Sequence, residues 1–196
     1  MPTLKPSTLA APLRRQALVG AGLALAGWPA AHPLAQSSEP WPEVIGALAQ
    51  ARLAGQTRLR VWGFEVYDAQ LWVAPGFRAS QFAQHPLAIS LSYLRALKGT
   101  AIADRSLKEM RAIQTLTDAQ ADQWLSAMRH TFPDVQATDR LTGLHQPGVG
   151  ARFWLNGQPR GSIADARFSA QFFGIWLHEA SSEPTLRREL LAGAAP

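Results

Sequence analysis

Three side chains that could hold an anion lie in a stretch where apolar and polar residues alternate, residues 57–73. They are Arg58, Arg60 and Tyr67. A guanidinium binds a carboxylate or an enolate through paired hydrogen bonds, and a phenol hydroxyl adds a further donor. If one of the arginines faces the interior beside Tyr67, the set predicts a binding site for a small carboxylate or phenolic ligand. The alternative is that both arginines are exposed and Tyr67 packs in the core with its hydroxyl at the rim.

Other kinds of site find little support in the sequence. The five histidines are scattered, and only His178 has a second ligand type, Glu179, directly beside it. Adjacent residues diverge on a helix, so this pair is no metal site. No serine lies in a Gly-x-Ser-x-Gly elbow, and the chain has no cysteine. We therefore predict no metal and no cofactor.

The alternating stretch requires two strands. Its apolar positions change phase at Trp62-Gly63, which predicts a turn between two antiparallel strands. A helix is expected before them, over 42–53. The other expected elements before residue 156 are a strand over 86–97, helices over 101–116 and 118–132, and strands over 140–145 and 149–155.

The segment Phe153–Leu177 predicts a hairpin that leads into an apolar helix. Asn156-Gly157 is a strong hairpin signal because both residues accept positive φ, and a short strand over 160–163 follows. Asp165 is the expected N-cap of a helix whose apolar residues share one face. Ser169 lies on this helix and is the one candidate catalytic residue in the segment.

The order of these elements is strands, two helices, strands, then two helices, the last starting near residues 182–184. This order is typical of an α+β fold in which helices cover one face of an antiparallel sheet. The expected domain spans residues 43–193, which is long enough to bury one substantial core.

The first 35 residues predict an export signal. Lys5 and the pair Arg14-Arg15 precede a charge-free run, and its apolar part, residues 17–28, has the length of a signal h-region. The segment 14–18 resembles a twin-arginine signal in which Ala17 replaces the usual aromatic residue. We expect a periplasmic protein with a linker over 36–42 and no integral membrane span after cleavage. An uncleaved N-terminal anchor is the alternative.

The formal net charge of +5 belongs largely to this leader, which carries three cations and no acid. Removing it leaves a formal charge of about +2, spread over the remaining sequence. The basic residues that remain are dispersed, so we predict no nucleic-acid surface.

Several segments together resemble the chalcone isomerase-like family, in its bacterial exported branch. Residues 63–73 are similar to that family's strand with a Val-Tyr-x-Ala-x-Leu-aromatic pattern. Leu155-Asn-Gly157, followed by Phe168 and by residues 175–177, resembles its C-terminal signature, and residues 186–193 resemble its terminal helix. The resemblance implies an open-faced β-sandwich, a curved antiparallel sheet covered by a layer of helices.

The resemblance also implies residue roles. The family's plant isomerases use a hairpin arginine, which falls on Arg58 or Arg60, and a penultimate-helix hydroxyl, which falls on Ser169. Their helix tyrosine and asparagine fall near Ile102 and Glu109, which cannot do the same work. Tyr67 instead resembles the fatty-acid-binding relatives, in which an arginine and a tyrosine hold a carboxylate.

Three functions follow as alternatives. The first is a non-catalytic protein that binds a small apolar carboxylate such as a fatty acid. The second is an intramolecular lyase or isomerase in which an arginine stabilises an enolate or phenolate, with Ser169 or Tyr67 as donor. The third is a structural partner domain in an envelope complex, with exposed aromatic side chains as its interface.

Overall fold

A computed structural model describes residues 39–196 of the chain. The predicted export signal, residues 1–35, lies outside the described residues, as does the start of the predicted linker. Pro42, the last residue of that linker, is the first residue of a helix, α1 (Pro42–Ala47). No helix in residues 39–196 is both long enough and apolar enough to cross a membrane.

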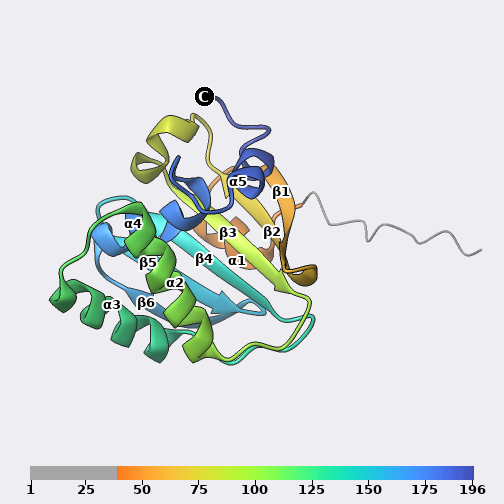
Figure 1. Cartoon of the computed structure of the whole chain (residues 1–196). Coiled ribbons are helices and arrows are strands. Elements are labelled where there is room, and N and C mark those ends of the chain that lie inside the picture. Colours follow the sequence, from red (N-terminus) through yellow and green to blue (C-terminus); the bar gives the residue numbers. More distant parts are fainter. Residues whose placement is uncertain (1–38) are drawn as a thin grey trace, which may run out of the picture. The chain divides into compact units, whose positions relative to one another are not determined.

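One six-stranded antiparallel sheet forms the centre of the fold (Figure 1). Each strand pairs with the next one along the chain, so the order across the sheet is β1-β2-β3-β4-β5-β6. The strands are β1 (Arg52–Val61), β2 (Phe64–Val73), β3 (Leu87–Tyr93), β4 (Arg140–Gln146), β5 (Gly150–Leu155) and β6 (Gln158–Ile163).

Four α-helices pack on one face of this sheet, which confirms the predicted α+β class. Two of them connect β3 to β4, and the other two follow β6 (Figure 1). The helices are α2 (Gly99–Ile113), α3 (Asp118–Thr131), α4 (Ala166–Leu177) and α5 (Pro184–Leu190). A short 3-10 helix, η1 (Ala79–Gln84), which the sequence analysis did not predict, joins β2 to β3.

The alternation of side chains along each strand decides which face they occupy. On β2 and β3, the residues Tyr67, Ala69, Leu71, Leu91 and Tyr93 belong to the core beneath the helices. The core continues into an aromatic group on α4, where successive rings stack or meet edge to face at centroid distances of 5.4–5.7 Å. Burial of these rings supplies much of the apolar contact of the helical layer.

The opposite face of the sheet carries α1. Val44 and Leu48 pack there against Trp72, Leu144 and Trp154. The residues 39–48 therefore belong to the packed structure instead of acting as a free connection to the sheet.

An ion pair lies beneath α1 on the same face. The Arg140 side chain donates to Glu43 at 3.1 Å, Thr142 donates to the same carboxylate at 2.8 Å, and the Arg140 guanidinium lies 3.7 Å above the Trp41 ring. A buried carboxylate needs such partners, because leaving it unpaired would cost several kcal/mol.

Most predicted turns and caps are confirmed. Trp62 and Gly63 have φ of 50° and 82°, and Asn156 and Gly157 have φ of 51° and 81°, so both hairpins turn where the sequence predicted. The Asp165 carboxylate accepts from the backbone N–H of Phe168 at 2.9 Å and caps α4.

The predicted helix over 42–53 is wrong in its second half. The helix ends at Ala47, and β1 already begins at Arg52, where it pairs with Val73. Tertiary pairing with the end of β2 overrides the local helical pattern here. The strand gains five residues beyond its predicted start at Thr57, and these residues lie against α5 through a close approach at Gly55.

Candidate functional site

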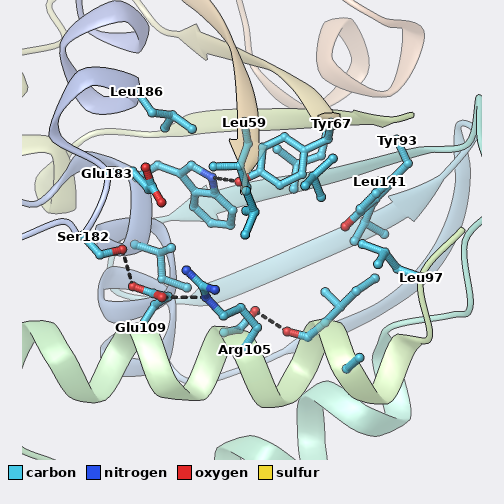
Figure 2. A pocket seen from close by; sticks show the side chains of 18 of the residues that line it. Leu59, Tyr67, Tyr93, Leu97, Arg105, Glu109, Leu141, Ser182, Glu183 and Leu186 are labelled. Atoms are coloured by element: carbon cyan, nitrogen blue, oxygen red, sulfur yellow. Dashed lines mark hydrogen bonds and ion pairs between the residues drawn. The ribbon is translucent and has the colours of Figure 1, made fainter. Parts of the chain in front are cut away.

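A cavity of about 400 Å³ opens between the sheet and the helices (Figure 2). It lies where the β1–β2 hairpin, β3, α2, α4 and the loop before α5 come together. This size is that of a pocket for a small organic ligand. Most of its wall is apolar, formed by side chains that include Leu59, Leu91, Leu97, Ile102, Leu141, Phe172, Ile175 and Leu186.

Tyr67 places a hydroxyl in this apolar wall. It faces the helices because it alternates with Asp68 on β2, and its oxygen accepts a hydrogen bond from Trp176 Nε1 at 3.0 Å (Figure 2). Burial raises the pKa of Tyr67 to about 12. The phenol is therefore protonated at neutral pH, and its own proton remains free to be donated to a ligand.

Tyr93 adds a second phenol from the neighbouring strand. It is the cross-strand partner of Tyr67, and the two rings meet edge to face with centroids 6.0 Å apart. Burial raises the pKa of Tyr93 as well, so this hydroxyl also stays protonated. Within residues 39–196 it has no hydrogen-bond partner, although it lines the cavity.

The charged end of the cavity comes from α2. Arg105 Nε and Glu109 Oε1 form an ion pair at 2.6 Å, one helical turn apart, and the Ser182 hydroxyl donates to Glu109 Oε2 at 2.6 Å. The Glu109 side chain is only 10% exposed, whereas that of Arg105 is 52% exposed. Figure 2 shows the guanidinium of Arg105 pointing from α2 toward the cavity.

Two further charged residues line the wall. Glu183 follows Ser182 in the loop before α5, and it is close enough to oppose ionisation of Tyr67. Arg95 follows β3 and lies over the Phe64 ring, 5.5 Å from its centroid. The cavity wall thus carries hydroxyls and both signs of charge at a few positions, and hydrocarbon elsewhere.

The structure brings only Tyr67, of the four predicted site residues, to the cavity. Arg58 donates through Nε to Asp68 at 2.6 Å and through Nη1 to Glu65 at 2.9 Å, while Arg60 donates to Glu65 at 2.9 Å. Neither arginine lines the cavity. The physical reason is the strand alternation, because Leu59 is the residue that pairs across from Tyr67 and shares its face.

Ser169 also lies away from the cavity. It is a fully buried residue of α4, and its hydroxyl lies 2.6 Å from His145 Nδ1. His145 Nε2 lies 3.0 Å from the Ala83 carbonyl oxygen, which assigns the ring proton to Nε2 and makes Nδ1 the acceptor. Burial lowers the pKa of His145, so the ring is neutral at pH 7. This pair joins β4 to α4, and neither residue lines the cavity.

Arg105 was not among the residues predicted from the sequence. It lies three residues after Ile102 and four before Glu109, the two positions that the family resemblance had brought to attention. Residues at these spacings share one helical face. All three line the cavity, so this spacing was the signal that could have identified Arg105.

Comparison with known proteins agrees with this architecture. A family model described as chalcone isomerase-like matches residues 50–192. A protein of Haemophilus influenzae, described only as uncharacterized, is 34% identical over 131 residues, which are 66% of this chain and 63% of that protein. The match therefore spans less than two thirds of that relative's length.

A solved structure shares the fold. The crystal structure of a fatty-acid binding protein of Arabidopsis thaliana matches with a TM-score of 0.57 and 13% identity, and the match covers 73% of this chain and 87% of the other. At this identity the similarity concerns the fold, a curved antiparallel sheet covered by helices.

Proposed function

The chain belongs to the chalcone isomerase-like family, and we propose that it is a binding protein of that family whose cavity holds a small apolar carboxylate such as a fatty acid. The observation that carries the proposal is the cavity itself: a largely hydrocarbon wall into which Arg105, Tyr67 and Tyr93 bring polar groups. The fatty-acid binding protein of Arabidopsis thaliana, which shares the fold, supports the same ligand class.

The carboxylate end of the ligand is assigned to Arg105. The ion pair with Glu109 uses Nε of the guanidinium. A ligand carboxylate can then approach the outer nitrogens, which are the atoms suited to paired hydrogen bonds. The hydroxyls of Tyr67 and Tyr93 supply further donors, because both phenols remain protonated.

The apolar wall takes the hydrocarbon chain. Its side chains come from β1, β3, β4 and α4, and they offer no hydrogen-bond partner along most of their length. A ligand with a polar group at both ends would leave one of them unpaired, at a cost of about 1–3 kcal/mol. The cavity therefore favours a ligand with a single polar end.

The lyase or isomerase alternative rests on the same two groups, Arg105 and Tyr67, as stabilisers of an enolate or phenolate. It lacks support at the positions that the plant isomerases use on this helix, which hold Ile102 and the ion-paired Glu109. A chalcone turnover assay separates the two proposals, since a binding protein leaves the rate at its spontaneous value.

We also propose that the protein acts in the periplasm, on the strength of the leader pattern in residues 1–35. A fusion of that leader to a reporter that is active only after export tests this part independently of the ligand.

Isothermal titration with dodecanoic acid and with the matched alcohol, dodecanol, tests the binding proposal. We expect saturable binding of one acid per chain, with the acid bound more tightly than the alcohol. Arg105→Met should weaken acid binding about tenfold, as expected for the loss of one charge-assisted contact, and leave alcohol binding unchanged. The matched control is Arg111→Met, because Arg111 lies on the same helix outside the cavity. Absence of acid binding, or equal losses for acid and alcohol, would refute the assignment.

A further inference from the structure

The tip of the β1–β2 hairpin carries two exposed aromatic residues. Trp62 is 94% exposed and Phe64 is 63% exposed, and with Ile45 and Val149 they are the large apolar side chains most exposed in residues 39–196. A single exposed apolar residue needs no explanation, but two aromatics side by side at one turn form a patch.

The backbone makes the choice of tryptophan more unusual. Trp62 has φ of 50°, in the left-handed region, which asparagine or glycine occupies at lower cost than a bulky residue. Since Trp62 is almost fully exposed, packing within the described chain does not repay this conformation. A residue that stabilises neither the turn nor the core is a candidate for contact with something outside the chain.

The patch is also the rim of the cavity. Trp62, Phe64 and Arg95 line the cavity while being exposed, so they mark its opening. Whatever the tip contacts therefore lies beside this part of the cavity rim.

Around the tip, the charge that is left without an ion pair is positive. Arg60 and Glu65 neutralise one another, whereas Arg95 forms no ion pair within residues 39–196 and lies over the Phe64 ring. An aromatic tip with a cation beside it has the composition of segments that settle at the boundary between lipid headgroups and acyl chains.

We propose that the β1–β2 hairpin tip docks onto an anionic lipid surface, with Trp62 and Phe64 inserted among the headgroups and Arg95 facing the lipid charge. The area favours lipid over a protein partner. Two aromatic side chains can bury about 150–250 Å² each, well below the ~800 Å² per partner of a stable protein interface. This proposal goes beyond ligand binding, and its test needs no ligand.

The test is co-sedimentation with vesicles of phosphatidylcholine, with and without phosphatidylglycerol. The wild-type protein and every variant are expressed in the same host and purified in the same way, so that all of them have the same N-terminus. We expect wild-type protein to bind the anionic vesicles and to be released by salt. The double variant Trp62→Ala/Phe64→Ala should bind these vesicles at least about tenfold more weakly.

Two further variants separate docking from folding. Trp62→Asn suits the left-handed turn better, so it should raise the midpoint of urea unfolding while weakening vesicle binding. The control Ile45→Ala/Val149→Ala removes two other exposed apolar side chains and should bind vesicles like the wild type. Arg95→Gln should reduce the preference for anionic vesicles.

Three results would overturn the proposal. One is vesicle binding by Trp62→Asn equal to that of the wild type. Another is an equal loss in the Ile45/Val149 control. The third is that the tip variants change the oligomeric state in light scattering but do not change vesicle binding, which would make the patch a contact between copies of the chain.

Discussion

Glu109→Gln should tighten the binding of a fatty acid while slightly lowering the stability of the fold. Glu109 holds Arg105 through Oε1 and accepts from Ser182 through Oε2, both at 2.6 Å. A glutamine keeps the shape of the side chain but removes the negative charge. The ligand carboxylate then no longer shares the arginine with a competing carboxylate.

The size of the gain follows from Coulomb's law. Two like charges about 6 Å apart interact by about 3 kcal/mol at an effective dielectric of about 20. Arg105 offsets part of this repulsion, and its side chain is 52% exposed, so solvent screens more of it. We expect a net gain of about 1 kcal/mol, which is about a fivefold lower Kd.

The stability cost has a separate origin. An ion pair with one half-exposed partner contributes about 0.5–1 kcal/mol, and the glutamine amide retains hydrogen bonds to the same neighbours. We expect the free energy of unfolding to fall by less than about 1 kcal/mol.

Titration calorimetry with dodecanoic acid and urea unfolding check both expectations. The matched control is Asp104→Asn, because Asp104 lies on the same helix, pairs with Arg129 on the protein surface and does not line the cavity. It changes the net charge equally and should leave the affinity unchanged. Weaker binding in Glu109→Gln, or equal tightening in the control, would refute the assignment of the carboxylate to Arg105.

Three further predictions concern the fold that holds the cavity. Burial lowers the pKa of His145, so the unfolded chain binds a proton at this side chain more readily than the folded protein does. The stabilising contribution of His145 should therefore be complete above about pH 6.5 and should fall as the pH drops below that value. His145→Gln should flatten the change in urea midpoint between pH 7.5 and 5.5. Gly55→Ala should destabilise the fold by about 3 kcal/mol or more, since its Cβ would lie 2.2 Å from the Glu189 carbonyl oxygen of α5. Gly46→Ala is the control, because open space surrounds Gly46, and its stability in thermal unfolding should stay within about 1 kcal/mol of the wild type. Asp165→Ala should lower the free energy of unfolding by about 2–3 kcal/mol, because the carboxylate both caps α4 and accepts from Trp124 Nε1 at 2.8 Å. Asp165→Asn keeps an acceptor for one of these donors, so its free energy of unfolding should fall by less in the same assay.

The sequence predicted local structure well wherever short-range chemistry decides it. The turns at Trp62-Gly63 and Asn156-Gly157 and the cap at Asp165 depend on a few neighbouring residues. The start of β1 depends on pairing with residues some twenty positions away, and a helical pattern over 42–53 concealed it. Long-range pairing is the information that a local pattern lacks.

The site was harder to predict because it depends on phase. Tyr67 was expected beside an inward-facing arginine of the same hairpin, but the register of that hairpin puts Leu59 opposite Tyr67. A shift of one residue along a strand moves a side chain to the other face of the sheet. The cation that we propose for the ligand, Arg105, lies on α2, and its place at the cavity depends on how the helices pack on the sheet.

The most direct test of ligand binding is a crystal structure of the protein grown with a fatty acid that carries bromine at the end of its chain. Anomalous scattering then locates the tail independently of the fitted protein. We predict one bromine site inside the cavity against the wall of Leu59, Leu141 and Phe172, with the carboxylate density within hydrogen-bond distance of Arg105. Bromine found only at the protein surface, or an acid whose carboxylate lies at Arg58 or Arg60, would contradict this account.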